Sequence, residues 1–334
     1  MQQTTYKTEL LTNDNIDQIK EIYESFRLKA TKDYRYEIEP LDFYSFKEFI
    51  ADGRLNGIAL FDEGVPAGIL IFVFEQHKAI ELNVIHVPDR KDLNKKRLAL
   101  AGALLEHLKN RTDWKVISYP LLGFQETFTR DIALLQFQFT GQAMVKFDFC
   151  DSISYKVLQK ADIGQLPEGY TIESWDEKYL DSAVEVINLG FKNSKDVLFD
   201  PRFLTPEGCK DVIKKITENV FGHFMPEETK VIVKDGSLEG VCFVHIATPA
   251  KANIPLISVR KNIRNKGLGK LVLKAAVAGI IKSLAEQKIA VSEVNAAVET
   301  DNYPALKMYR RIGFREDYTY PHAYYSNPNY KESE

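Results

Sequence analysis

The sequence predicts a mixed α/β protein (α+β mixed sheet) that contains two copies of one domain in tandem. Three observations carry this prediction: the chain length, a glycine-marked hairpin pattern that occurs twice, and the same succession of strands and helices after each hairpin. The chain has 334 residues, which at roughly 100–200 residues per domain favours two domains. With 45% hydrophobic and 27% charged residues, the composition is that of a globular protein.

The repeated pattern is an apolar run, a glycine turn and a second apolar run, which is typical of a β-hairpin. It occurs at residues 58–72 and again at 230–244, with a constant offset of 172 positions. The glycines that match at this offset are Gly64 with Gly236, Gly68 with Gly240, and Gly141 with Gly313. We therefore predict domains at residues 1–160 and 168–334, joined by the polar segment 159–169, which contains Gly and Pro.

The elements of the two copies are predicted in the same order. A helical region at 15–26, repeated at 177–191, precedes a variable stretch rich in aromatic residues. The hairpin is followed by one more strand, at 80–87 and at 254–259. The helix, strand and short helix that come next are predicted at 93–110, 115–120 and 130–139 in the first copy, and at 267–287, 289–298 and 303–312 in the second.

Charge and composition exclude several classes of partner. The formal net charge is −3, with 44 basic and 47 acidic residues, so we expect no broad basic surface for nucleic acid or anionic lipid. Three scattered cysteines and the absence of a His/Asp/Glu cluster predict neither a disulfide framework nor a metal site. The polar start and the lack of a long apolar run predict a cytoplasmic protein that does not enter a membrane.

The segment after the strand at 255–259 has the features of an anion-binding turn. Gly267 and Gly269 allow close approach of the backbone to a ligand, and a helix begins at once. The first N–H groups of a helix point at an anion, and the helix dipole favours negative charge there. Arg264, Lys266 and Lys270 add full positive charges. A pyrophosphate fits such a turn.

Two motifs in the second copy resemble the signatures of the GNAT acyltransferase superfamily. The first, V-x-x-x-x-R-x-x-G-x-G, is met by Val259, Arg264, Gly267 and Gly269. The second, V-x-x-x-N-x-x-A-x-x-x-Y-x-x-x-G-F, is met by Val298, Asn302, Ala305, Tyr309, Gly313 and Phe314. Order, spacing and predicted elements agree, so the chain is identified as a pair of tandem GNAT-like acyl-CoA N-acyltransferase domains.

The resemblance implies acetyl-CoA as co-substrate and direct transfer of its acetyl group to an amine. It places the pyrophosphate on the turn and the pantetheine arm along a strand that splays from its neighbour. The cofactor-binding residues it implies are Ile257, Ser258, Val259, Arg264, Asn265, Lys266, Gly267, Leu268, Gly269, Lys270 and Asn302. Tyr309 is expected to protonate the leaving thiolate as general acid, and backbone N–H near Val259 to polarise the thioester carbonyl.

The first copy lacks these groups. At the same offset, Arg264 falls on Asp92, and the two glycines of the turn fall on Lys95 and Arg97. Tyr309 falls on Phe137, and Asn302 falls on Arg130. We therefore expect a non-catalytic GNAT-like first domain, which either helps to shape the acceptor site or only packs.

The sequence leaves the general base, the acceptor and the oligomeric state open. We expect Glu239, Glu293 and Glu299 to be solvated surface carboxylates, and His322 to line the substrate side or the surface. The acceptor is a small amine, an amino acid or a peptide N-terminus. A Fem-type aminoacyl-transferase that uses aminoacyl-tRNA ranks lower, because the CoA turn is intact. A non-catalytic acyl-CoA sensor or scaffold is the alternative from another class.

Overall fold

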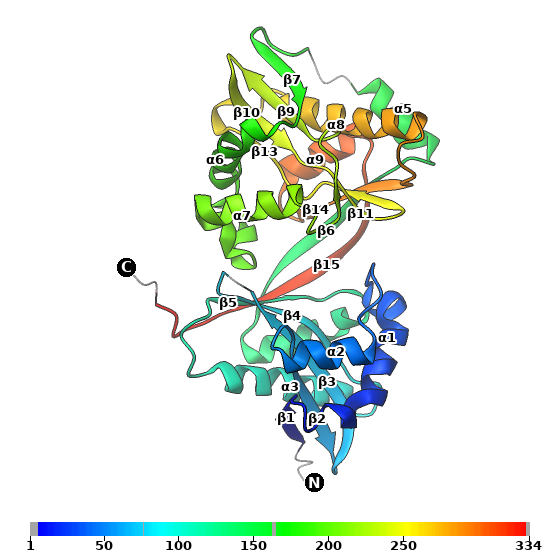
Figure 1. Cartoon of the computed structure of the whole chain (residues 1–334), viewed down its shortest axis with the longest axis vertical. Coiled ribbons are helices and arrows are strands. Elements are labelled where there is room, and N and C mark those ends of the chain that lie inside the picture. Colours follow the sequence, from blue (N-terminus) through cyan, green and yellow to red (C-terminus); the bar gives the residue numbers. More distant parts are fainter. Residues whose placement is uncertain (1–5, 76, 162–164, 332–334) are drawn as a thin grey trace. The chain divides into compact units, whose positions relative to one another are not determined.

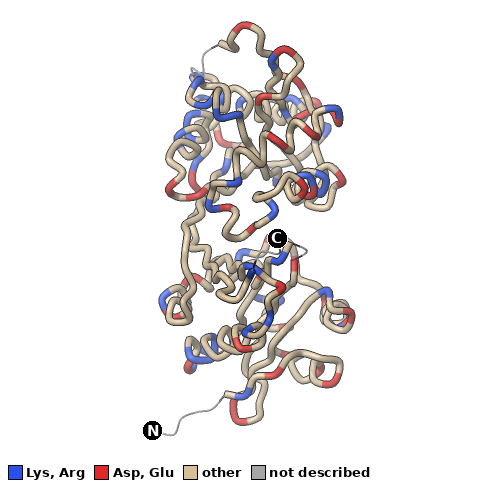
Figure 2. The backbone as a smooth tube through the Cα atoms, turned by 90° about the vertical axis from the view of Figure 1, so that its left-hand side faces the viewer, with Lys and Arg blue, Asp and Glu red and all other residues tan. Residues whose placement is uncertain are grey.

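The computed structural model describes residues 6–75, 77–161 and 165–331. Residues 162–164 of the predicted joint lie outside the described residues. The chain divides into two compact units, which we call unit 1 (Met1–Thr140 with Tyr320–Glu334) and unit 2 (Gly141–Thr319). Basic and acidic residues are interspersed along the chain in both units (Figure 2).

Unit 1 is built on a sheet whose strands run in the order β1-β2-β3-β4-β5-β15. The pairs β1–β2, β2–β3, β3–β4 and β5–β15 are antiparallel, whereas β4 and β5 are parallel. The strands are β1 (Lys7–Leu10), β2 (Asn56–Asp62), β3 (Val65–Phe74), β4 (Ala79–His86), β5 (Val116–Pro120) and the end of β15 (Arg315–Ser326).

Helices cover both faces of the unit 1 sheet, because its central strands carry apolar residues on both faces. Ile58 and Leu60 of β2 pack in one core with α3, while Ala59 and Phe61 pack in the other core with α1 and α2. The helices are η1 (Ile16–Ile19), α1 (Lys20–Tyr34), α2 (Phe43–Ala51), α3 (Leu93–Leu108), η2 (Gly123–Phe128), α4 (Thr129–Ile132) and η3 (Ala133–Leu135).

Unit 2 contains a sheet of order β6-β14-β12-β11-β8 and a second sheet of order β13-β10-β9-β7 (Figure 1). The first group comprises β6 (Gln138–Asp148, from Gly141 on), β8 (His223–Phe224), β11 (His245–Thr248), β12 (Lys251–Asn253) and β14 (Glu293–Glu299). The second comprises β7 (Tyr170–Ser174), β9 (Lys230–Lys234), β10 (Ser237–Cys242) and β13 (Ile257–Val259).

Helices also cover both faces in unit 2. Val231 and Val233 of β9 pack in the core formed with α6 and α7, whereas Ile232 packs in the core formed with α8 and α9. The helices are α5 (Ser152–Lys160), η4 (Glu177–Tyr179), α6 (Leu180–Phe191), η5 (Lys195–Leu198), η6 (Pro201–Leu204), α7 (Pro206–Thr217), η7 (Lys261–Ile263), α8 (Leu268–Ala285) and α9 (Tyr303–Ile312).

Both predicted hairpins are present, and their turns have the same backbone conformation. Glu63 and Gly64 have φ of 52° and 82°, and Asp235 and Gly236 have φ of 49° and 79°. Each pair is the two-residue loop between antiparallel strands. Positive φ at both positions is the type I′ turn that suits a twisted hairpin, and it explains the glycine in both copies.

The two units do not follow the predicted boundaries at 1–160 and 168–334. Residues 141–160, which the repeat places in the first copy, lie in unit 2, and Tyr320–Glu334 lies in unit 1. Strand pairing explains this: β6 pairs with β14 over 142–148, and β15 pairs with β5 over 322–326. Each copy therefore contributes its last strand to the sheet of the other unit.

Two predicted elements are shorter than expected. The helix predicted at 130–139 is interrupted, because Gln136 adopts a left-handed φ of 67° and β6 begins at Gln138. The strand predicted at 254–259 is regular only from Ile257 to Val259. This second irregularity is where the candidate site forms.

Candidate active site

A gap between β13 and β14 forms the centre of the candidate site. β12 pairs in parallel with the first three residues of β14, and Ile254 N donates to Asn295 O at 2.8 Å. Beyond this point, within the described residues, β13 pairs with β10 and β14 pairs with β6, but the two do not pair with each other. The strands therefore diverge, as the resemblance of the two motifs implies for 257–259.

The backbone of β13 presents polar groups to this gap. Arg260 N donates to Glu239 O, and Phe243 N donates to Leu256 O, both at 2.9 Å. In an antiparallel strand the hydrogen-bonding direction alternates from residue to residue. The N–H and C=O groups of Ile257 and Val259 therefore point away from β10, toward the gap.

A cavity of about 860 Å³ lies in this region of unit 2. Its lining includes nine of the predicted cofactor-binding residues: Ile257, Ser258, Val259, Arg264, Asn265, Gly267, Gly269, Lys270 and Asn302. Lys266 and Leu268 do not line it; Lys266 is exposed, and the Leu268 side chain is buried in the core. The sequence did not predict Gly190, Ser194, Asp196, Tyr303, Lys307, Met308 and Arg311, which also line the cavity.

The start of α8 has the geometry of an anion-binding turn. Gly267 has φ of 85°, a conformation that glycine adopts without strain. A Cβ added at Gly269 would lie 3.2 Å from Met308 Sδ, so the missing side chain keeps the turn open. Among the described residues, no partner accepts from the N–H of Leu268 or Gly269, as is usual for the first amides of a helix.

Cationic side chains surround this turn. Arg264, Lys270, Lys307 and Arg311 all line the cavity, and Arg264 Nε donates to Val259 O at 3.3 Å. Free helix-start amides, two glycines and four cations form a donor set that suits the phosphates of a nucleotide cofactor. The residues present therefore fit acetyl-CoA.

Comparison with known proteins agrees with this geometry. Residues 238–323 match the family described as FR47-like protein, and no curated protein matches the chain. The structure is similar to a GCN5-related N-acetyltransferase from Sphaerobacter thermophilus, with 12% identity, a TM-score of 0.63 and 98% of each chain covered. A tandem GNAT protein from the clavulanic acid biosynthesis pathway has 14% identity and a TM-score of 0.59, covering 99% of this chain and 100% of that one.

A third similar structure is the glucosamine N-acetyltransferase region of a fungal multi-domain β-N-acetylglucosaminidase. It has 11% identity and a TM-score of 0.61, and the match covers 96% of this chain and 38% of that one. The chain has a tandem GNAT fold. The expectation from the two motifs is thereby confirmed for the fold.

Tyr309 of the second GNAT copy lies on α9, directly after Met308 of the cavity lining, but does not itself line the cavity. Its side chain is 2% exposed and packs edge-on against Phe314, with ring centroids 5.0 Å apart. Burial, followed by the nearby Cys242 thiol, raises the pKa of its hydroxyl. The phenol is therefore in its neutral, proton-donating form.

Asn302 has a structural contact as well as a place in the cavity. It is the N-cap of α9, and its side-chain oxygen accepts from Ala305 N at 3.2 Å. Such a cap satisfies a first-turn amide and fixes where the helix starts. Asn302 therefore determines the position of the α9 residues that line the cavity.

The three carboxylates that were expected on the surface have different environments. Glu293 is paired with Lys146 (3.5 Å) and Lys251 (3.4 Å), and Glu239 lies 3.6 Å from Arg260 Nε. All three side chains are half-buried, so the surface expectation is wrong for each of them. Glu299 differs in that its Oε1 accepts from Lys195 N at 3.0 Å, and its pKa is raised to about 7 by burial and then by neighbouring acids.

His322 lies in unit 1 and is buried. Its Nε2 is 2.8 Å from Ser118 Oγ, and burial lowers its pKa to about 4. The histidine is therefore neutral and structural in unit 1, rather than a group at the cavity of unit 2.

In the first GNAT copy the same gap is filled by the chain itself. β4 pairs with β5 only over 79–81, and beyond that point Ile85 N, the counterpart of Ile257 N, donates to Gln125 Oε1 at 3.2 Å. Tyr119 OH donates to the same oxygen at 2.6 Å. A buried side chain thus takes the place that a cofactor would need.

Arg97 completes this filling at the position that corresponds to Gly269. Its side chain is 1% exposed, and its guanidinium carbon lies 4.7 Å from the centroid of the Phe124 ring. Arg97 Nη1 donates to Thr127 Oγ1 at 2.9 Å, while Nε and Nη2 have no partner among the described residues. The sequence predicts that the first copy lacks the anion-binding turn. In the structure, the buried Arg97 side chain occupies the corresponding place.

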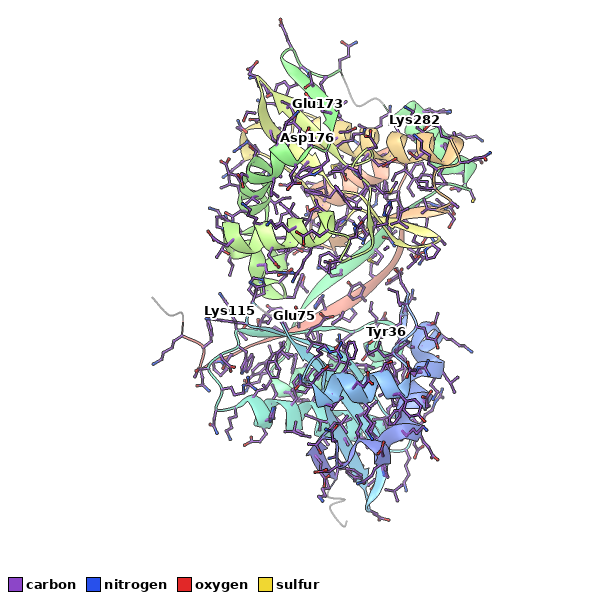
Figure 3. All side chains as sticks on the ribbon, in the orientation of Figure 1. Tyr36, Glu75, Lys115, Glu173, Asp176 and Lys282 are labelled. Carbon is purple, nitrogen blue, oxygen red and sulfur yellow. The ribbon has the colours of Figure 1, made fainter. Side chains whose placement is uncertain are left out.

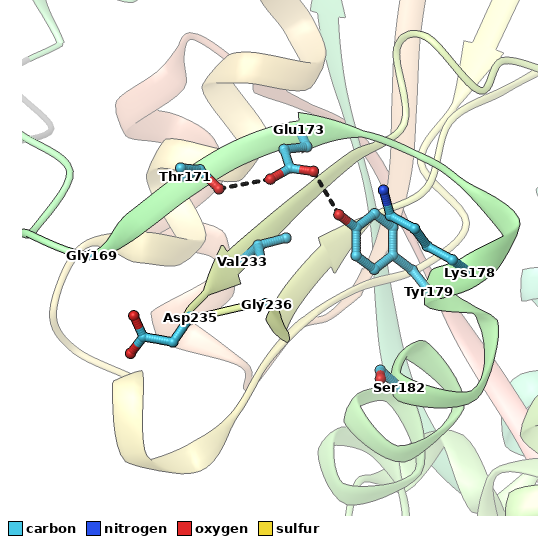
Figure 4. Close-up of a pocket in the computed structure, with 9 residues that line it drawn as sticks. All are labelled: Gly169, Thr171, Glu173, Lys178, Tyr179, Ser182, Val233, Asp235 and Gly236. Carbon is cyan, nitrogen blue, oxygen red and sulfur yellow. Dashed lines mark hydrogen bonds between the residues drawn. The ribbon is translucent and has the colours of Figure 1, made fainter.

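A second cavity, of about 600 Å³, lies between β7, η4 and the β9–β10 turn (Figure 4). Its central carboxylate, Glu173, accepts from Thr171 at 2.9 Å and from Tyr179 OH at 2.5 Å. Glu173 and Asp176 lie at the end of β7 that leads to η4 (Figure 3). The cavity includes no residue of either GNAT motif. The hydrogen bonds of Glu173 are made to other residues of its own lining.

Over residues 6–75, 77–161 and 165–331, no helix is long and apolar enough to span a membrane. Over the same residues, no group of three or more His, Cys, Asp and Glu side chains is arranged to hold a metal ion.

Proposed function

We propose that the protein is an acetyl-CoA-dependent N-acetyltransferase, with its active site in the second GNAT copy. It transfers the acetyl group directly to the amine of a small molecule or peptide in the cytoplasm. One observation carries this proposal: the backbone groups of Ile257 and Val259, the helix-start amides of α8 and four cations all meet at one cavity. In the first copy the corresponding gap is filled.

Each part of the cavity has its own task. The start of α8, with Arg264 and Lys270, holds the pyrophosphate, and Lys307 and Arg311 add positive charge. The N–H groups of β13 bind the pantetheine arm and polarise the thioester carbonyl. Acetyl-CoA supplies the activated acetyl group, and the chain supplies orientation and proton transfer.

Tyr309 is proposed as the group that protonates the leaving thiolate. Its raised pKa keeps the hydroxyl protonated at neutral pH, which a general acid requires. Its place on α9, next to Met308, brings it beside the cavity lining.

Gly267→Asp tests the placement of the cofactor. The added carboxylate repels phosphate, and the side chain is strained at a φ of 85°. We expect loss of acetyl-CoA binding in calorimetry and loss of CoA release with hydroxylamine as the acceptor amine.

Gly236→Asp is the matched control. Gly236 has φ of 79° and open space around it, and it lies in the β9–β10 turn rather than the cavity. The Gly236→Asp variant therefore introduces the same negative charge and a similar backbone strain, but away from the proposed cofactor site. Acetyl-CoA affinity that is unchanged in Gly267→Asp, or lost equally in both variants, would contradict the proposed placement.

A further inference from the structure

Two carboxyl groups from distant parts of the chain lie next to each other, and Asp196, but not Glu299, belongs to the cavity lining. Asp196 lies in η5, just after α6, and lines the cavity. Glu299 is the last residue of β14, and its Oε1 accepts from Lys195 N at 3.0 Å. The negative charge of Asp196 acts on Glu299 and raises its pKa. Both side chains are half-buried.

The surrounding sheet face carries polar groups that the protein leaves unsatisfied. Gln142 of β6 stands directly opposite Glu299, and Asn295 lies on the same face of β14, four residues earlier. Gln142 is 4% exposed and Asn295 is 7% exposed. Gln142 Nε2 and Asn295 Oδ1 have no partner among the described residues. Buried amide groups without partners are costly, and a polar ligand would satisfy them.

This face is the one opposite α8 and α9. Val294, Ala296 and Val298 of β14 are buried in the core with those helices, so alternation turns Asn295 and Glu299 to the other side of the sheet. The cofactor turn lies at the start of α8. The acids and amides are therefore placed to meet a second reactant, not the phosphates.

We propose that Asp196 and Glu299 receive the acceptor as a protonated, polar primary amine, and that Glu299 removes a proton from its nitrogen. This inference rests on the proposed acetyltransferase function and identifies the acceptor class and the general base of that site. Gln142 and Asn295 bind hydrogen-bonding groups of the acceptor next to the amine.

The charges around Glu299 suit this role. Burial, followed by the negative charges of Asp196 and Asp301, raises its pKa to about 7, while Lys195 acts in the opposite direction. Lys195 is itself paired with Asp301. Burial also raises the pKa of Asp196, against a hydrogen bond from Ser194 Oγ at 2.8 Å. A base with a pKa near the working pH is effective in proton transfer.

The proton balance of the step is complete. An ammonium gives one proton to the Glu299 carboxylate, and the freed lone pair forms a bond to the thioester carbon. When the C–S bond breaks, the leaving sulfur gains a proton from Tyr309, and the second proton that the nitrogen loses passes through solvent to reprotonate Tyr309. Glu299 then releases its proton to solvent, so the products are an amide, CoA thiol and one proton.

The experiment compares the wild-type chain with Glu299→Gln, Asp196→Asn and the control Glu293→Gln. Glu293 lies on the same strand and face, but its carboxylate is paired with Lys146 and Lys251. CoA release is measured from pH 5.5 to 9 with glucosamine, L-lysine and spermidine as cationic amines. Hydroxylamine, which is largely uncharged at neutral pH, serves as an acceptor that needs no base.

We expect wild-type kcat/KM for at least one cationic amine to rise with pH through an inflection near 7. Glu299→Gln should lower it by at least about 100-fold at pH 7 and abolish the inflection, while hydroxylamine turnover and acetyl-CoA affinity change little. Asp196→Asn removes a neighbouring negative charge, so the inflection should move to lower pH. Glu293→Gln should keep the wild-type profile.

Two results would overturn the inference while the proposed function stands. One is a wild-type pH profile in Glu299→Gln with full turnover of the cationic amines. The other is turnover of hydroxylamine with none of the three cationic amines accepted. Failure of the proposed function would be distinct, because the wild-type chain would then neither bind acetyl-CoA nor acetylate hydroxylamine.

Discussion

At the scale of residues, the proposed cofactor end of the site depends on the backbone and the proposed acceptor end depends on side chains. Gly267 and the N–H groups of Ile257 and Val259 form the proposed cofactor end, and the turn is visible in sequence because only glycine suits it. Asp196 and Glu299 form the proposed acceptor end, and they are separated by about 100 residues. Nothing in the sequence pattern brings them together.

Tyr309→Phe isolates the hydroxyl of Tyr309 from its ring. The ring packs against Phe314, so phenylalanine keeps this contact and the fold. We expect kcat to fall by roughly 10- to 100-fold, within the range of general acid catalysis, with the dissociation constant for acetyl-CoA and the Tm nearly unchanged. A kcat equal to that of the wild type would show that another group, or water, protonates the thiolate.

At the scale of elements, the close approach of α6 to β13 defines one wall of the cavity. A Cβ placed on Gly190 would lie 2.2 Å from Ser258 Oγ, and this hydroxyl donates to Val186 O at 3.2 Å. Gly190→Ala must therefore break that bond or move α6 away from β13. Overpacking of this kind lowers the free energy of unfolding by about 1–3 kcal/mol. We therefore expect a lower Tm and, because the cavity wall moves, a roughly tenfold weaker affinity for acetyl-CoA.

Gly102→Ala is the control for this variant, because Gly102 lies within α3 and a Cβ there meets no atom within 4 Å. Alanine is the better helix former by about 1 kcal/mol, so this variant should be at least as stable as the wild type and bind acetyl-CoA equally well. If Gly190→Ala also retained full affinity and Tm, the wall between α6 and β13 would be shown to be adaptable.

Elements with strong periodicity could be predicted, and irregular ones could not. The strand 80–87 and the helix 93–110 agree within two residues with β4 and α3, because their apolar spacing and helix ends are local signals. The strand 254–259 is interrupted where it leaves β14, since its hydrogen-bond partner changes from Asn295 to β10. That change depends on tertiary pairing and has no local signal.

At the scale of the whole molecule, the two GNAT copies differ in the gap between their diverging strands. The gap is open in the second copy, and in the first copy it is filled by side chains of the protein itself. The sequence shows that the first copy lacks Gly267, Gly269 and Tyr309 counterparts. It does not show that Gln125 bonds to Ile85 N or that Arg97 is buried. The repeat likewise suggests two consecutive domains, whereas β6 and β15 each pair in the other unit, because strand pairing is not restricted to neighbours in sequence.

Calorimetric titration of the intact chain with acetyl-CoA tests the central claim most directly. The second copy has an open cavity at the glycine turn of α8, whereas the corresponding gap in the first copy is filled by Gln125 and Arg97. We therefore expect one molecule of acetyl-CoA bound per chain, with micromolar affinity. Two bound molecules would contradict the account of the filled first copy, and no binding would contradict the assignment of the second copy as an acetyl-CoA site.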